Sequence, residues 1–62
     1  MRKHILSAME AHAAAQYPKE ACGLVLAIGR KQKYHPCRNI ATEPTEEFRI
    51  DPEDYAAAAE QL

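Results

Sequence analysis

With 62 residues, eight basic and nine acidic side chains and a net charge of −1, the sequence is long enough for only one small domain. The balanced charges exclude a strongly basic nucleic-acid binder and a protein steered to an anionic membrane surface. No apolar run approaches the roughly 18–20 residues that span a bilayer. Two cysteines do not make a disulfide framework, so we expect a cytoplasmic protein with reduced thiols.

The N-terminal segment, residues 2–16, is predicted to form a helix. It is rich in alanine, and apolar side chains recur at every fourth position along one stripe. Tyr17-Pro18 ends this helix, because the residue before a proline is pushed out of the helical region. Glu20 then falls in a short connector, a kind of position where catalytic groups are commonly held.

A β-hairpin is predicted next. Residues 22–28 form a continuous apolar run of strand length, which indicates a strand buried on both faces. Residues 29–31 begin with glycine and turn the chain, and residues 32–36 form the second strand. The strand could continue over 37–40 after a kink or bulge at Pro36.

The last third is predicted as a loop, a short strand and a second helix. Residues 41–47 are polar and read as the loop, whereas residues 48–50 alternate apolar and charged side chains, as a half-buried strand does. Asp51 suits an N-cap, followed by proline at the first helical position and by acids in the first turn. Because no stop signal precedes Leu62, we expect the sequence to be cut from a longer one.

The order helix, strands, helix predicts an α+β fold or the opening half of a three-layer α/β fold. Large core-forming side chains are few, so the core is thin for a domain that folds alone.

The most informative segment is the motif Pro18-x-Glu20-x-Cys22-Gly23-Leu24, in which a glutamate stands between a helix and a buried strand. By composition alone, Glu20 would be read as an ordinary exposed glutamate. The motif, however, resembles the opening signature of the JAMM, or MPN-plus, zinc metallopeptidase family.

The resemblance covers about residues 3–60. Three further features fall in the family's order: Tyr34-His35-Pro36, Asn39, and Phe48-x-Ile50-Asp51-Pro52. The pattern is most similar to the short bacterial and phage form of the family, notably the N-terminal domain of phage tail assembly proteins of the lambda K type.

The resemblance implies a zinc-dependent hydrolase that cleaves peptide or isopeptide bonds in a protein substrate. In the family, a His-x-His motif and an aspartate hold the zinc, and a glutamate matching Glu20 passes a proton from the zinc-bound water to the leaving amine. This sequence contains neither His-x-His nor Ser-x-x-Asp. The resemblance therefore implies a partial JAMM-like domain over residues 1–62, with Glu20 as its catalytic residue and no metal ligand. We expect zinc only in the longer parent protein, and no peptidase activity in this chain alone.

Other chemistry is less favoured by the residues. His35 and Cys37 share a face of the predicted strand and could meet Cys22 in a three-ligand zinc site, although structural zinc sites normally have four ligands. A nucleophilic cysteine–histidine pair lacks a third group to orient it. His4 and His12 stand eight residues apart, not the four of HExxH, so we expect solvated or interface residues.

Two alternatives to the peptidase remain. The first is a non-catalytic tail-assembly or protein-interaction module with the same fold, whose partners would be phage tail proteins. Zinc ligands outside this sequence would distinguish the enzyme from the module. The second is a homodimer formed through the exposed strand 22–28, because an unpaired strand edge recruits another chain. Neither nucleic acid nor a membrane is expected as a partner.

Overall fold

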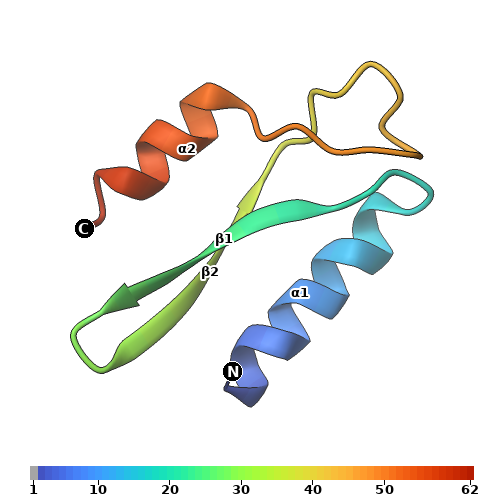
Figure 1. The fold of residues 1–62 in the computed structure, drawn as a ribbon. Helices are drawn as coiled ribbons and strands as arrows, with labels where there is room; N and C mark the ends of the chain where they lie inside the picture. Colours follow the sequence, from blue (N-terminus) through green and yellow to red (C-terminus); the bar gives the residue numbers. More distant parts are fainter. Residues whose placement is uncertain (1) are drawn as a thin grey trace.

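The structure is a computed structural model that describes residues 2–62, and it confirms the predicted order of elements. Helix α1 spans Lys3–Gln16, strand β1 Cys22–Ile28, strand β2 Lys31–Cys37 and helix α2 Pro52–Ala59. The two strands form an antiparallel hairpin, with α1 on one side and α2 on the other (Figure 1). The chain is thus an α+β unit with a helix on each face of a two-stranded sheet. No helix within residues 2–62 is long and apolar enough to cross a membrane.

The hairpin register follows from its two-residue turn. Gly29 has a φ of 62°, and positive φ at the first central position is typical of a type II′ turn. Ile28 therefore pairs with Lys31, and the register continues without a break to Cys22 opposite Cys37. The predicted kink or bulge at Pro36 is wrong, because this residue pairs regularly with Gly23. The second strand is one residue longer at each end than predicted.

Alternation along β2 divides its side chains between the two helices. On one face, Tyr34 Oη lies 2.7 Å from His12 Nδ1 of α1. On the other face, Lys33 Nζ donates to Gln61 Oε1 at 2.9 Å, just beyond the end of α2. His4 of α1 contacts the carbonyl of Gln32 at 3.0 Å. The helices are therefore fixed to the same strand from opposite sides, and both histidines of α1 are structural contacts.

The buried core is small. Its hydrophobic members are Ile5, Cys22, Leu26, Cys37 and Ala58. The prediction that β1 is buried on both faces is wrong, because Val25, which lies on the α1 side opposite Tyr34, is 40% exposed. The physical reason is that α1 lies against β2, which leaves the α1-side face of β1 uncovered within the described chain.

The segment before α2 is less regular than predicted. Residues 48–50 do not form a strand: one isolated bridge joins Asn39 and Ile50, and Phe48 is exposed. The predicted helix start is confirmed, since the Asp51 side chain accepts from Glu53 N at 2.9 Å and Pro52 opens the helix. Helix α2 ends at Ala59, three residues earlier than predicted, and the chain then turns.

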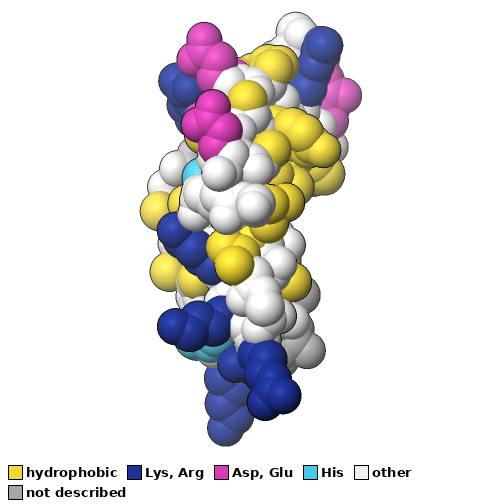
Figure 2. All heavy atoms as spheres, turned by 90° about the vertical axis from the view of Figure 1, so that its left-hand side faces the viewer, with side chains coloured by type: hydrophobic (Ala, Val, Ile, Leu, Met, Phe, Trp, Pro, Cys, Tyr) yellow, Lys and Arg dark blue, Asp and Glu magenta, His cyan; other side chains and the backbone are white. Residues whose placement is uncertain are grey.

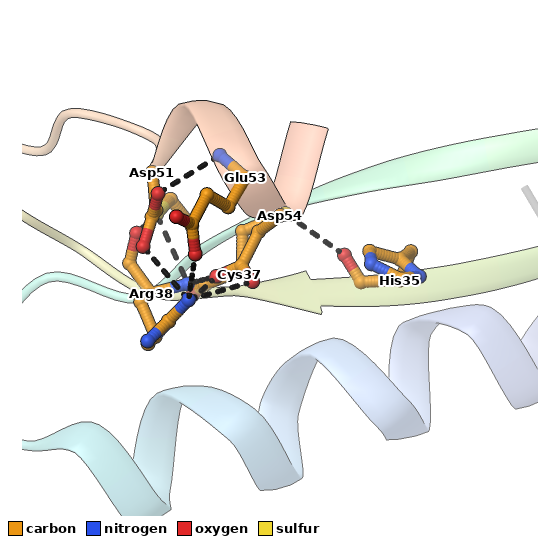
Figure 3. Close-up of polar contacts among 7 residues, drawn as sticks. His35, Cys37, Arg38, Asp51, Glu53 and Asp54 are labelled. Carbon is orange, nitrogen blue, oxygen red and sulfur yellow. Dashed lines mark hydrogen bonds and ion pairs between the residues drawn. The ribbon is translucent and has the colours of Figure 1, made fainter. Parts of the chain in front are cut away.

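Arg38, directly after β2, joins the sheet to the start of α2 (Figure 3). Its guanidinium lies 2.9 Å from Asp51 and 3.1 Å from Asp54, and its backbone N–H donates to Asp54 at 2.7 Å. These hydrogen bonds from Arg38 hold the pKa of the Asp54 carboxyl below its ordinary value. Exposed ion pairs contribute little to stability by themselves. The hydrogen bond from the Arg38 backbone N–H to Asp54 therefore provides most of the stabilisation at this contact.

Tyr34 covers Gly23 across the hairpin. A Cβ on Gly23 would overlap the Tyr34 ring, so a larger residue at this position of β1 requires the ring to move. The ring lies diagonally opposite Gly23 on the α1 face, where an aromatic side chain can cover the exposed backbone of a glycine. Gly23 of the sequence motif therefore has a packing role.

We predict that Gly23→Ala lowers the free energy of unfolding by about 1–3 kcal/mol, because the added methyl group displaces the Tyr34 ring. Urea unfolding followed by circular dichroism measures the change. In a Tyr34→Ala background the same substitution should cost clearly less, because the space is then free. An equal cost in both backgrounds would contradict the proposed overlap.

The pKa of Asp54 predicts a pH dependence of stability. Because this pKa is lowered on folding, the Asp54 contribution is complete above the ordinary value of 3.8 and is lost as the pH falls through the lowered value. Unfolding free energies measured between about pH 5 and pH 2.5 should therefore fall more steeply for the wild type than for Asp54→Asn. Parallel profiles for the two proteins would show that the Arg38 contact contributes nothing.

Candidate functional site

Glu20 stands in the connector between α1 and β1, as predicted, and its side chain is exposed. The backbone at this residue is held on both sides. Its N–H donates to the carbonyl of Pro44 at 2.6 Å, and its carbonyl accepts from Asn39 Nδ2 at 2.9 Å. An exposed carboxylate on a fixed backbone can exchange a proton with a group that binds beside it.

The Asn39 side chain gathers the loop over residues 40–49. Besides Glu20, its Nδ2 donates to the carbonyls of Pro44 at 3.3 Å and Glu47 at 3.0 Å. Its Oδ1 accepts from the backbone N–H groups of Ala41 and Arg49, each at 3.0 Å. The orientation of the amide is determined by these partners, since a flipped amide would bring its oxygen against carbonyl oxygens.

The sequence placed Asn39 in the family pattern but did not indicate that its side chain bonds the Glu20 connector. One local signal was available. Asparagine side chains commonly bond nearby backbone at turns, and Asn39 directly follows a strand and precedes a polar loop. That signal could not indicate Glu20 as a partner, because Glu20 lies 19 residues before Asn39 in the sequence.

The two cysteines do not join His35 in a metal site. Cys22 and Cys37 are opposite one another, free and buried. The Cys22 thiol points to the carbonyls of Cys37 and Arg38, and the Cys37 thiol to the carbonyl of His35. His35 Nδ1 contacts Gln61 Nε2 at 3.1 Å. Across residues 2–62, no group of three potential ligands is placed to hold a metal ion. The residues present therefore do not fit a zinc ion.

The environment of these thiols also disfavours a nucleophilic role. Burial raises the pKa of Cys22 and of Cys37, and the negative charge of Asp54 raises both further. The reactive species of a cysteine is the thiolate, which a raised pKa suppresses at neutral pH. Both residues act here as small apolar side chains at the end of the hairpin.

A recess of about 370 Å³ lies between α1, the end of β2 and the start of α2. It is lined by His12, Gln16, Pro36, Cys37, Arg38 and Asp54. Its charged groups already bond within the protein, as Asp54 does to Arg38, and Glu20 does not line it. The recess is thus separate from the glutamate connector.

Residues 2–62 match the family described as prokaryotic homologs of the JAB domain. The chain is also 55% identical over 58 residues to tail tip assembly protein K of Escherichia phage N15. That alignment covers 94% of this chain and 24% of the phage protein, so the chain spans about a quarter of this relative. No solved structure matches the chain. Because the family match takes in all but the first residue, the chain belongs to the prokaryotic homologs of the JAB domain, which confirms the resemblance to JAMM proteins drawn from its motifs.

Proposed function

We propose that this chain is the N-terminal, glutamate-bearing part of a JAMM-like, zinc-dependent peptidase domain in a phage or prophage tail assembly protein. The reaction would be hydrolysis of a peptide or isopeptide bond. Family membership and the likeness to a tail tip assembly protein support this proposal. The observation that carries it is the exposed Glu20 carboxylate on a backbone held at both its N–H and its carbonyl.

Glu20 would act as the proton carrier of the site. Its carboxylate is accessible, and proton transfer by a positioned carboxylate contributes roughly 10²–10⁴-fold to such reactions. Since residues 2–62 do not provide a zinc site, the metal ligands would come from residues outside this sequence. The chain alone would therefore bind no zinc and cleave nothing. The substrates or partners would be tail proteins, and the work would take place in the cytoplasm of the bacterial host.

A chimera tests this proposal. In the tail tip assembly protein of phage N15, the matching 58 residues are replaced by those of this chain. Glu20→Gln should abolish cleavage of tail proteins and lower plaque formation by at least about 10²-fold, because the proton carrier is lost. Glu10→Gln, an exposed change on α1, is the matched control and should leave both unchanged.

Zinc analysis of the same chimera separates the enzyme from the assembly module. The peptidase proposal expects bound zinc in the chimera and none in the 62-residue chain. A chimera that forms plaques without zinc, and equally well with Glu20→Gln, would refute the peptidase and support a non-catalytic module.

One observation favours that alternative, the assembly or interaction module: the two edges of the hairpin differ. The edge of β2 is obstructed. Pro36 has no N–H, the Gln32 carbonyl is in contact with His4, and the Arg30 carbonyl accepts from Arg2 at 2.7 Å. Strand β1 carries no charged residue, and Val25 at its centre is exposed. Such an uncharged edge is a template for another strand.

The register of the hairpin shows which backbone N–H and carbonyl groups of β1 point outward, toward a possible partner strand. Ile28 and Lys31 flank the two-residue turn and form the closing hydrogen-bonded pair. By alternation, Val25 and Tyr34 are a non-hydrogen-bonded pair, so the N–H and carbonyl of Val25 point away from β2. A second copy of the chain could pair there in antiparallel fashion about Val25, without bringing like charges together.

Apolar surface continues beside this edge. A shallow recess of about 150 Å³ is lined by Leu24, Val25, Leu26, Tyr55, Ala58, Ala59 and Leu62. Figure 2 shows hydrophobic side chains in several patches over the upper and middle parts of the face it presents, with Lys and Arg gathered at the lower end. A strand added to β1 would cover part of the recess. Together these features support self-association of the assembly module as a homodimer that pairs through β1.

We predict that the 62-residue chain dimerises through β1, and that Val25→Lys makes it monomeric, because a charge on the edge opposes strand addition. Sedimentation equilibrium up to roughly 1 mM, which detects even weak association, measures the mass. Ser7→Lys, an exposed change on α1, is the control and should stay dimeric. A wild-type monomer throughout this range would exclude the homodimer.

A further inference from the structure

We propose that Asn39 is the positioning residue of Glu20: its side-chain amide fixes the backbone from which the glutamate projects, relative to the end of the hairpin. This inference rests on the proposed catalytic role of Glu20. Asn39 touches the backbone of Glu20 and not its carboxylate, so it would act through placement and not through chemistry.

The amide of Asn39 is fully used. It has two N–H protons, which serve three carbonyls, and an oxygen with two lone pairs, which serve two backbone N–H groups. A carboxylate would retain the two acceptor contacts but would repel the three carbonyls. A longer amide or a hydroxyl could not match both sets. The position therefore requires asparagine for its donors and its acceptor together.

Glu20 is tied to the loop by two routes that meet at the Pro44 carbonyl. Its N–H bonds the Pro44 carbonyl directly, and its carbonyl reaches the same residue through the Asn39 amide. Asn39 in turn is fixed by the bridge to Ile50, in which the N–H of Ile40 donates to the Arg49 carbonyl at 2.9 Å. The connector, the loop and the end of β2 thus form one hydrogen-bonded unit.

The consequence concerns the geometry of catalysis. Since the Glu20 side chain is exposed, the described protein places the carboxylate mainly through the position of its Cα. A displacement of about 1 Å in a catalytic group can cost roughly 10²-fold in rate. Loss of the Asn39 donors would free the Glu20 carbonyl and so the backbone from which the carboxylate projects.

Asn39→Asp isolates the donor side of the amide. The new carboxylate can still accept from the N–H groups of Ala41 and Arg49, but it cannot donate to the carbonyls of Glu20, Pro44 and Glu47. Amide hydrogen exchange by NMR on the 62-residue chain follows the Glu20 N–H, whose acceptor is the Pro44 carbonyl that Asn39 also binds, separately from the Ala41 and Arg49 N–H groups. We expect the Glu20 N–H to exchange at least about tenfold faster, and those of Ala41 and Arg49 to change less than about threefold. Gln16→Glu, another amide-to-acid change, should alter none of them.

Two results would overturn the inference. An unchanged Glu20 exchange rate would show that Asn39 does not hold the connector. Equal acceleration at all three sites would show that Asn39 only folds the loop. If Asn39→Asp does not fold, the wild-type chain decides: the Asn39 side-chain NH₂ protons should exchange at least about tenfold more slowly than those of Gln16. Equal rates for the two amides would contradict the network.

The chimera then links position to rate. Asn39→Asp should lower kcat about 10²-fold with KM unchanged, because the glutamate is retained but displaced. Unchanged kcat would overturn the positioning role. If Glu20→Gln leaves the chimera active, the proposed function fails, and the exchange experiment still decides whether Asn39 holds Glu20. The failures of the two proposals are therefore distinguishable.

Discussion

The register of the β-hairpin is the constraint on which the rest of this small structure depends. A turn at Gly29 and Arg30 sets it, and it brings Cys22 opposite Cys37 seven residues along each strand. The chain therefore leaves β2 beside the connector that enters β1, which is why Asn39 can bond Glu20. A slip of one residue would turn every side chain to the opposite face. Tyr34 would then leave Gly23, and both helices would lose their contacts.

Much of this fold could be predicted from sequence because its signals are local. The helix of residues 3–16, the hairpin turn at Gly29 and the cap at Asp51 each follow from neighbouring residues. What sequence missed depends on distant contacts. The apolar run of β1 indicated burial on both faces, but burial depends on what covers a strand, and α1 covers β2. The alternation of residues 48–50 indicated a strand, but their partner segment supplies a single bridge at Asn39.

For the candidate site, too, sequence motifs identified single residues but not the contacts between residues that lie far apart in the chain. Glu20 was identified by a motif and its family resemblance; the structure places it, exposed, between α1 and β1, and its catalytic role stays a prediction. The zinc ligands of the family are absent from the motifs of this sequence, and residues 2–62 do not assemble a substitute from Cys22, His35 and Cys37. Instead, the cysteines complete a thin core. The described residues form a scaffold that holds an exposed glutamate and the network around Asn39, and they leave an uncharged edge along β1.

The most direct test of this account is a nuclear Overhauser experiment on the 62-residue chain. In an antiparallel pair that is not hydrogen-bonded, the two Hα atoms approach most closely. The register predicts strong Hα–Hα effects between Val25 and Tyr34 and between Ala27 and Gln32, together with effects from the Asn39 side-chain NH₂ protons to Hα of Ala21. That set of contacts would confirm the hairpin and the placement of the Glu20 connector. Effects that pair Val25 with Lys33 or His35, or an Asn39 amide with no contact to the connector, would contradict it.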